Sequence, residues 1–180
     1  MILAWDPGLR HLGVAGGTRQ GGLLFAFMLD NPIGHQVRGS EAHKAMQRAL
    51  TERLIGFDID EIAFEKPQTY KGTSYNSGVN QEDLDELVGI NYYCQQSFEK
   101  VRFRKITSYY PHEWKRNLPK QAMVNRFIGA GNLKPILTPL EQSIIILPKT
   151  CIICNKDVSL DVYDAVGIFL HHIGRNFLTG

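Results

Sequence analysis

The sequence predicts an α/β fold in which a mixed five-stranded sheet is flanked by helices. Three short apolar runs near the start of the chain come before any helical pattern, and turn residues separate them, which is typical of antiparallel strands. Two further apolar runs each follow a segment whose apolar residues recur at helical spacing. We therefore expect three antiparallel strands, then two further strands, with helices packed on the sheet.

The three runs that open the sheet lie at residues 2–5, 13–18 and 23–29. The first is continuously apolar, as expected of a strand that is buried on both faces. It ends at Asp6, because Pro7-Gly8 is a turn sequence. The second and third runs are joined by Gln20-Gly21-Gly22 and are expected to form an antiparallel hairpin.

The later elements alternate between helical and extended patterns. Apolar spacing predicts helices over residues 40–56, 82–99 and 159–174 and strands over residues 62–65 and 101–107. The polar stretch 67–80 has no helical period, so we expect a loop there. Short helices follow the fifth strand. The clearest should start at Thr138, where Pro139 and Glu141 complete a capping box, and should end near Leu147.

Length and composition are those of a single globular domain spanning residues 1–180. The chain is 43% hydrophobic and 21% charged. It contains no repeat or low-complexity tract, which argues against a solenoid or a disordered chain. No apolar run approaches the roughly 18 residues that span a bilayer, and residues 1–5 do not resemble a secretory signal. We expect a cytoplasmic protein without a membrane partner.

Three cysteines, Cys94, Cys151 and Cys154, are an odd number in a chain for which no secretory signal is predicted. We therefore expect reduced thiols and no disulfide framework. Cys151 and Cys154 form a CxxC pair, but tetrahedral zinc needs two further ligands that no second pair supplies. A metal or redox role and an ordinary pair of half-buried thiols both stay open.

The basic residues are concentrated in one segment, although the net charge of the whole chain is only +2. Residues 100–126 contain a single acid, Glu113, and eight basic side chains: Lys100, Arg102, Arg104, Lys105, Lys115, Arg116, Lys120 and Arg126. Such a segment can bind a polyanion or form a solvated basic face. Composition alone does not choose between these.

Four carboxylates lie at the ends of buried apolar elements, where solvation is poor: Asp6, Glu65, Asp161 and Asp164. Asp6 ends the first strand and Glu65 ends the fourth. The other two stand three residues apart, so they share one face of the last helix. Ordinary alternatives are a turn residue at Asp6, an ion pair with Lys66 or an arginine at Glu65, and a helix-dipole contact at Asp161.

If the first and fourth strands are neighbours, these carboxylates converge and repel one another. Divalent cations would neutralise such a cluster, and oxygen ligands favour Mg²⁺ or Mn²⁺. A pair of these ions can activate a water molecule and stabilise the leaving oxygen of a phosphodiester. The acids therefore predict metal-assisted phosphodiester hydrolysis.

The order of these motifs resembles that of the RuvC family of Holliday junction resolvases, which has an RNase H-like fold. Members of that family open with a strand that ends in Asp-Pro-Gly, as in Asp6-Pro7-Gly8, and place a glutamate at the end of the fourth strand, as in Glu65. They close with two aspartates on a helix that has a histidine near its end, as in Asp161, Asp164 and His171-His172. The similarity in order spans nearly the whole chain.

A segment between the fifth strand and the last helix extends the resemblance. Tyr110-Pro111, followed by Lys115 and Lys120, looks like the family's tyrosine-proline segment with two lysines. The resemblance implies that one of these lysines contacts the scissile phosphate or stabilises its developing charge. It also implies that the four acids are catalytic and hold two Mg²⁺ ions, for which Mn²⁺ can substitute.

The resemblance further implies that the protein binds branched DNA. Phosphate contacts give affinity without reading sequence, so a four-way junction would be recognised by its shape and by the two-fold symmetry of a homodimer. An aromatic residue in the loop after Glu65 is expected to stack at the junction centre. The expected DNA-binding residues are Tyr70, Tyr75, Arg102, Arg104, Lys105, Lys115, Arg116 and Lys120.

The expected function is that of a crossover junction endodeoxyribonuclease, which resolves four-way junctions by paired symmetric nicks that leave 5′-phosphates, in DNA recombination and repair. The compact size and divergent loop favour a phage or viral member. Two alternatives stay open: a branched-DNA or RNA-directed nuclease of the same fold, such as a phage debranching enzyme, and a junction-binding protein without catalysis. The roles of His171, His172 and Asp157 also stay open.

Overall fold

The computed structural model describes residues 1–34, 36–67, 81–98, 105–146 and 159–178. Its strands are β1 (Ile2–Pro7), β2 (His11–Thr18), β3 (Gly22–Asp30), β4 (Glu61–Glu65) and β5 (Lys105–Tyr109). They form one five-stranded sheet in the order β3-β2-β1-β4-β5. The predicted mixed sheet is confirmed. Of the predicted fifth strand, residues 101–104 lie outside the described residues.

The strand directions bring the ends of several strands to one edge of the sheet. β2 runs antiparallel to both of its neighbours, β1 and β3. β4 and β5 run parallel to β1. Trp5 pairs with Phe64 across β1 and β4, and Asp6 pairs with Gly13 across β1 and β2. The carboxyl ends of β1 and β4 and the start of β2 therefore meet at the same edge.

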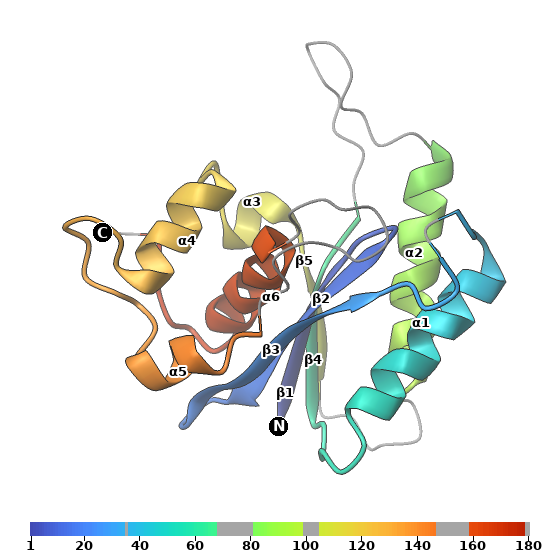
Figure 1. Cartoon of the computed structure of the whole chain (residues 1–180), viewed down its shortest axis with the longest axis horizontal. Helices are drawn as coiled ribbons and strands as arrows, with labels where there is room; N and C mark the ends of the chain where they lie inside the picture. Colours follow the sequence, from blue (N-terminus) through green and yellow to red (C-terminus); the bar gives the residue numbers. More distant parts are fainter. Residues whose placement is uncertain (35, 68–80, 99–104, 147–158, 179–180) are drawn as a thin grey trace.

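Helices cover both faces of the sheet (Figure 1). α1 (Ser40–Arg53) and α2 (Gln81–Gln96) pack on one face, and α6 (Ser159–His172) crosses the other. Three shorter helices lie on the same side as α6: α3 (Pro111–Trp114), α4 (Lys120–Ile128) and α5 (Pro139–Ser143). Among the described residues, no helix is both long and apolar enough to cross a membrane.

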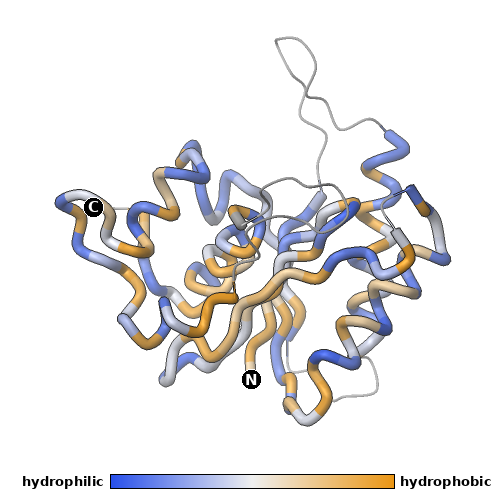
Figure 2. The backbone as a smooth tube through the Cα atoms, viewed as in Figure 1, coloured by the Kyte–Doolittle hydropathy of each residue, from blue (hydrophilic) through white to orange (hydrophobic). Residues whose placement is uncertain are grey.

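Alternate side chains of the strands supply two separate cores, as the two-residue period of a strand requires. Ile2 and Ala4 of β1 pack in the core under α6, whereas Leu3 and Trp5 pack in the core under α1 and α2. Trp5 stacks on Phe64 of β4, with ring centroids 5.2 Å apart. Figure 2 shows hydrophobic residues concentrated along the central strands. The sheet is therefore buried on both faces, as the apolar first strand predicts.

The capping box of α5 forms, but the helix is shorter than predicted. Thr138 Oγ1 accepts a hydrogen bond from Glu141 N (3.2 Å), and Glu141 Oε2 accepts one from Thr138 N (2.8 Å). The helix nevertheless ends at Ser143, because Ile145 leaves the helical path and forms a bridge with Ala26 of β3. Packing against the sheet here overrides the local helical pattern.

One of the three cysteines can be placed. Cys94 is buried and unbonded in α2, where burial raises the pKa of its thiol to about 12. A thiol with so high a pKa is inert, which agrees with the expected reduced state. Cys151 and Cys154 lie outside the described residues.

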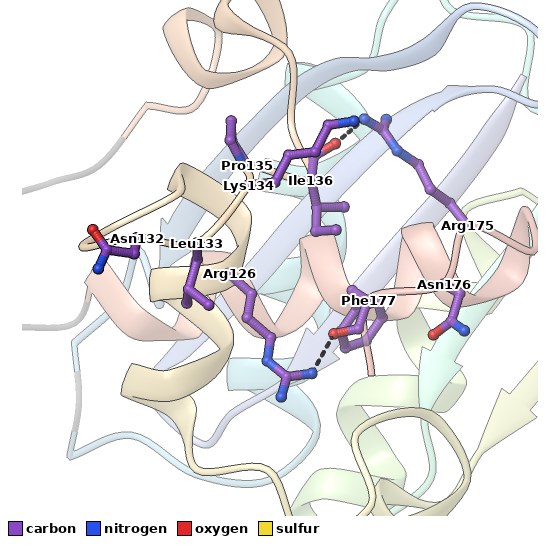
Figure 3. A pocket seen from close by; sticks show the side chains of 9 residues that line it. All are labelled: Arg126, Asn132, Leu133, Lys134, Pro135, Ile136, Arg175, Asn176 and Phe177. Carbon is purple, nitrogen blue, oxygen red and sulfur yellow. Dashed lines mark hydrogen bonds between the residues drawn. The ribbon is translucent and has the colours of Figure 1, made fainter. Parts of the chain in front are cut away.

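Glu141 ties the C-terminal segment to the sheet. Its carboxylate accepts hydrogen bonds from Leu23 N (3.1 Å) in β3 and from Arg175 Nη1 (2.5 Å) beyond α6. Arg175 also reaches the carbonyl oxygen of Ile136 (Figure 3). Burial alone would raise the pKa of Glu141, but the hydrogen bonds from Arg175, Thr138 N and Leu23 N outweigh it and lower the pKa to about 2.

Glu141→Gln is expected to destabilise the fold, because Arg175 and the Leu23 N–H lose their charged acceptor. Breaking a buried ion pair costs roughly 3–5 kcal/mol, and the partial exposure of Arg175 reduces the expected loss to about 2–3 kcal/mol. The lowered pKa stabilises the folded chain above about pH 4.5, and this contribution is lost as the pH falls toward 2.

Urea unfolding of the wild type and the Gln variant at several pH values measures this contribution. The difference in unfolding free energy between the two proteins should be largest near neutral pH. It should shrink steadily as the pH falls below the pKa of an ordinary glutamate. A difference that does not change with pH would contradict this role of the carboxylate.

Candidate metal centre

Three elements bring the four predicted acids together at one edge of the sheet. Asp6 lies at the end of β1, Glu65 ends β4, and Asp161 and Asp164 lie one turn apart in the first half of α6. The start of α6 lies very close to β2: a Cβ atom added to Gly13 would lie only 2.3 Å from the Asp161 carbonyl oxygen. The absence of a side chain at Gly13 thus allows α6 to approach the strand end that carries Asp6.

The four acids line a cavity of about 310 Å³. Its other lining residues are Pro7, Gly8, His11, Lys115 and Lys120. One carboxylate oxygen from each of Asp6, Asp161 and Asp164 lies within 4.8 Å of the other two. The fourth acid, Glu65, borders the same cavity from the neighbouring strand. The predicted convergence of the acids is therefore present in the structure.

Two lysines place their ammonium groups inside the acid cluster. Lys120 Nζ lies 3.0 Å from Asp161 Oδ1 and also contacts Asp164 Oδ2. Lys115 Nζ lies 3.5 Å from Glu65 Oε2 and 3.6 Å from Asp164 Oδ1. Burial would lower the pKa of both ammonium groups, but the carboxylates, Asp164 foremost, raise it above the usual value. Both lysines therefore carry their charge.

The two ammonium groups do not fully compensate the acids. Burial raises the pKa of Asp6 well above its usual range, and Glu65 and Asp164 raise it further, although both lysines oppose them. Burial also raises the pKa of Glu65 despite its contacts with Lys115 and Trp114. Proton binding is favoured at both groups because burial disfavours the charged carboxylates and the neighbouring acids repel them, and the two lysines do not offset this.

Asp164 shows that the residues present fit a divalent cation. Its side chain is 1% exposed, and neither carboxylate oxygen has a hydrogen bond of good geometry to any described residue; only the two lysine ammonium groups lie close. Buried oxygens without such partners are uncommon, and a set of carboxylates is the donor set that hard cations prefer. Asp6, Asp161 and Asp164 could hold such an ion, with Glu65 beside them.

Glu65 is held in place by two residues that no sequence motif indicated. Trp114 Nε1 donates a hydrogen bond to Glu65 Oε2 (3.0 Å), and Asn91 Nδ2 donates one to the Glu65 carbonyl oxygen (3.3 Å). The tryptophan beside Lys115 was a usable signal, since a buried indole N–H needs an acceptor. The alternative pairing with Lys66 is not observed, because its ammonium group lies over the Tyr110 ring, 4.7 Å from the centroid.

The structure does not gather all the predicted DNA-binding residues at the acids. Arg116 is exposed in the turn after α3, next to Lys115. Lys105 starts β5 and lies beside Glu61 in the strand register. Glu61 is at the opposite end of β4 from Glu65. Outside the described residues lie Tyr70, Tyr75, Arg102, Arg104 and also Asp157.

The paired histidines lie at the far end of α6 from the acids. His172 is buried, with Nε2 2.9 Å from Glu61 Oε2 and Nδ1 2.9 Å from the Tyr109 hydroxyl. Burial lowers the pKa of His172 although Glu61 opposes this; the neutral ring can donate to Glu61 and accept from Tyr109. The Tyr109 ring also meets His171 edge-on. The two histidines therefore connect α6 to the sheet, away from the acid cavity.

A larger cavity, of about 550 Å³, lies between α4 and the C-terminal segment (Figure 3). Its arginines already have partners: Arg126 donates to the Phe177 carbonyl oxygen (3.0 Å), and Arg175 is bound by Glu141. None of its lining residues, all within the described part of the chain, is acidic. The smaller acidic cavity is therefore the candidate site.

Comparison with known proteins finds similarity in structure and none in sequence. No protein-family model and no curated protein sequence matches the chain. The RuvC of Thermus thermophilus in complex with a Holliday junction substrate superposes with a TM-score of 0.60 at 18% identity, covering 95% of this chain and 90% of that chain. A second Thermus thermophilus RuvC structure gives a TM-score of 0.54 at 17% identity, covering 97% and 96%. The chain is therefore RuvC-like in its RNase H-like fold over nearly its whole length.

Proposed function

We propose that the protein is a metal-dependent, structure-specific endonuclease that resolves four-way DNA junctions by paired symmetric nicks. The observation that carries this proposal is the meeting of Asp6, Glu65, Asp161 and Asp164 in one cavity with two lysines. Support also comes from the fold, since the similar Thermus thermophilus RuvC is described in complex with a Holliday junction substrate.

The four carboxylates would hold two Mg²⁺ or Mn²⁺ ions. When bound, such a pair of ions supplies an activated water molecule and stabilises the charge on the scissile phosphate and the leaving oxygen. The protein keeps the ligands in position: the Gly13 contact brings Asp161 to Asp6, and Trp114 fixes the Glu65 carboxylate. Rigid placement of ligands by outer partners is what a metal site of this kind requires.

The two lysines would be able to contact a DNA phosphate when cations neutralise the carboxylates. In the chain alone, Lys115 and Lys120 contact the same oxygens that the proposal assigns to cations. A carboxylate oxygen that held a cation would no longer hold the ammonium group of its lysine. The side chains of Lys120 and Lys115 are 40% and 17% exposed, so their ammonium groups can then turn toward a phosphate at the cavity mouth.

Resolution of a junction requires cuts in two strands that are related by symmetry. A homodimer would present two copies of the cavity related by a two-fold axis, which matches the symmetry of a four-way junction. Gel filtration with light scattering tests this part of the proposal. A mass of one chain, both alone and on the junction, would contradict it.

Asp164→Asn is expected to abolish cleavage of a labelled four-way junction in Mg²⁺. The variant removes a ligand from the centre of the site, so its rate should fall by more than the roughly 10- to 100-fold that loss of an outer partner costs a metal site. The matched control is Asp58→Asn, which changes an exposed aspartate in the segment before β4. The wild type and the control should give paired symmetric nicks with 5′-phosphates.

Two outcomes would replace this function with one of the alternatives. If the wild type leaves the junction intact but cuts flaps or the RNA of a hybrid duplex, it is a branched-DNA or RNA-directed nuclease. If it binds the junction and cuts nothing in either Mg²⁺ or Mn²⁺, it is a junction-binding protein without catalysis.

Lys120→Gln is expected to lower stability without metal and to lower cleavage with it. In EDTA, Asp161 and Asp164 lose their closest positive charge; because Lys120 is partly exposed, we expect a loss of about 1–2 kcal/mol, or roughly 2–8 °C in Tm. Mg²⁺ should then raise the Tm of the variant more than that of the wild type, because no ammonium group competes for the oxygens.

Thermal unfolding in EDTA and in Mg²⁺, together with single-turnover cleavage, tests this prediction. Cleavage should fall about 100-fold, as when one charge-stabilising donor is removed. Lys44→Gln, which removes an exposed lysine from α1, should behave like the wild type in both assays. Equal stability of Lys120→Gln and the wild type in EDTA would show that the ammonium group does not compensate the acids.

A further inference from the structure

A second cavity adjoins the metal centre and continues from it across the turn between β1 and β2. The second cavity, of about 370 Å³, shares Gly8, His11 and Asp161 with the acid cavity. Its other lining residues are Leu9, Arg10, Arg38 and Asp83. The second cavity therefore adjoins the acid cavity, and it is bounded by the turn between β1 and β2 and by residues near the starts of α1 and α2. We call it the turn groove.

The turn that lines this groove is held rigidly. His11 Nδ1 lies 2.7 Å from Asp30 Oδ1, so an N–H on Nδ1 donates to the carboxylate. Asn31 N donates to the Arg10 carbonyl oxygen (2.9 Å). Gly8 passes so close to His11 that a Cβ atom on it would lie 2.4 Å from the His11 carbonyl oxygen. Residues 8–11 are therefore fixed against the end of β3.

Arg10, on this rigid turn, is a cation that has no counter-charge among the described residues. Its side chain is exposed, and no described acid or carbonyl group binds its guanidinium. Arg38, which lines the same cavity, is bound to Asp83 at 2.8 Å, so its charge is largely compensated within the protein. A ligand in the turn groove would thus meet Arg10, which no described acid compensates, in the same cavity as Asp161, one of the acids that would hold metal.

We propose that the DNA strand that is cleaved runs from the metal centre along the turn groove. Arg10 would bind a phosphate of that strand next to the scissile one. The inference rests on the proposed nuclease function. An arginine held on a rigid turn suits this task, because its guanidinium binds phosphate oxygens in a planar, bidentate manner. His11 and Asp30 are positioning residues, which act on the DNA through the turn that carries Arg10.

Arg10→Gln is expected to weaken junction binding without changing the metal centre. Binding is measured in Ca²⁺ with a fluorescent four-way junction over a range of salt concentrations. Loss of one phosphate contact should reduce the slope of log K against log salt by about 1 and weaken binding roughly tenfold at low salt. Lys44→Gln removes the same charge from α1, outside both cavities, and should leave both quantities unchanged.

Neutral phosphate analogues locate the contact on the DNA. A single methylphosphonate is placed in turn at each phosphate that flanks the scissile one on the cut strand. For the wild type, one position should weaken binding about as much as Arg10→Gln does. At that same position the analogue should have no further effect on the Arg10→Gln protein, because both changes remove the same contact.

Asp30→Asn tests the positioning role of the pair. It should reduce the effect of the sensitive methylphosphonate while the Tm rise in Mg²⁺ stays that of the wild type. If the wild type cuts junctions but Arg10→Gln and Lys44→Gln bind alike, or if no phosphate position depends on Arg10, the strand path is wrong and the nuclease stands. If the wild type neither binds nor cuts branched DNA, the proposed function itself fails.

Discussion

Several carboxylates lie at one poorly hydrated edge of the sheet and repel one another. The groups around that edge are arranged so that they reduce this repulsion. Burial and the neighbouring acids raise the pKa of Asp6 well above its usual range, so the chain alone holds this group in an unfavourable environment. Lys115 and Lys120 bring two ammonium groups into the cluster and reduce the repulsion. The remaining demand for positive charge is the physical basis for a divalent metal site.

The fold delivers these groups from distant parts of the chain by ordinary packing. Parallel pairing of β1 with β4 places Asp6 and Glu65 at the same edge. The bare backbone of Gly13 lets α6 approach β2, so that Asp161 and Asp164 reach that edge from the opposite end of the chain. Each element is stabilised by the two hydrophobic cores, whose burial offsets the electrostatic cost of the site.

Much of the fold and the four acids could be predicted from the sequence. The succession of strands along the chain followed from short apolar runs, and the acids stood out because Asp6, Glu65 and Asp164 end or interrupt buried elements. The supporting contacts could not be predicted. Asn91 and Trp114 hold Glu65 across long separations in the chain, and nothing in their local sequence shows which strand end they meet.

Local patterns also failed where tertiary contacts decide. The apolar residues after Ser143 fit a longer helix, but the bridge between Ile145 and Ala26 ends it. The sequence left the roles of His171 and His172 open, and in the structure both lie at the end of α6 that is remote from the acids. His11 had no motif to mark it, although it borders the acid cavity. A phage or viral origin stays a prediction.

The most direct measurement is anomalous diffraction from crystals of the wild-type protein soaked in Mn²⁺. If the acid cluster is a metal centre, anomalous peaks will lie among the carboxylates of Asp6, Glu65, Asp161 and Asp164, and the ammonium groups of the two lysines will have moved off those oxygens. Crystals that bind no Mn²⁺ in this cavity, with the lysines still seated on the acids, would contradict the account.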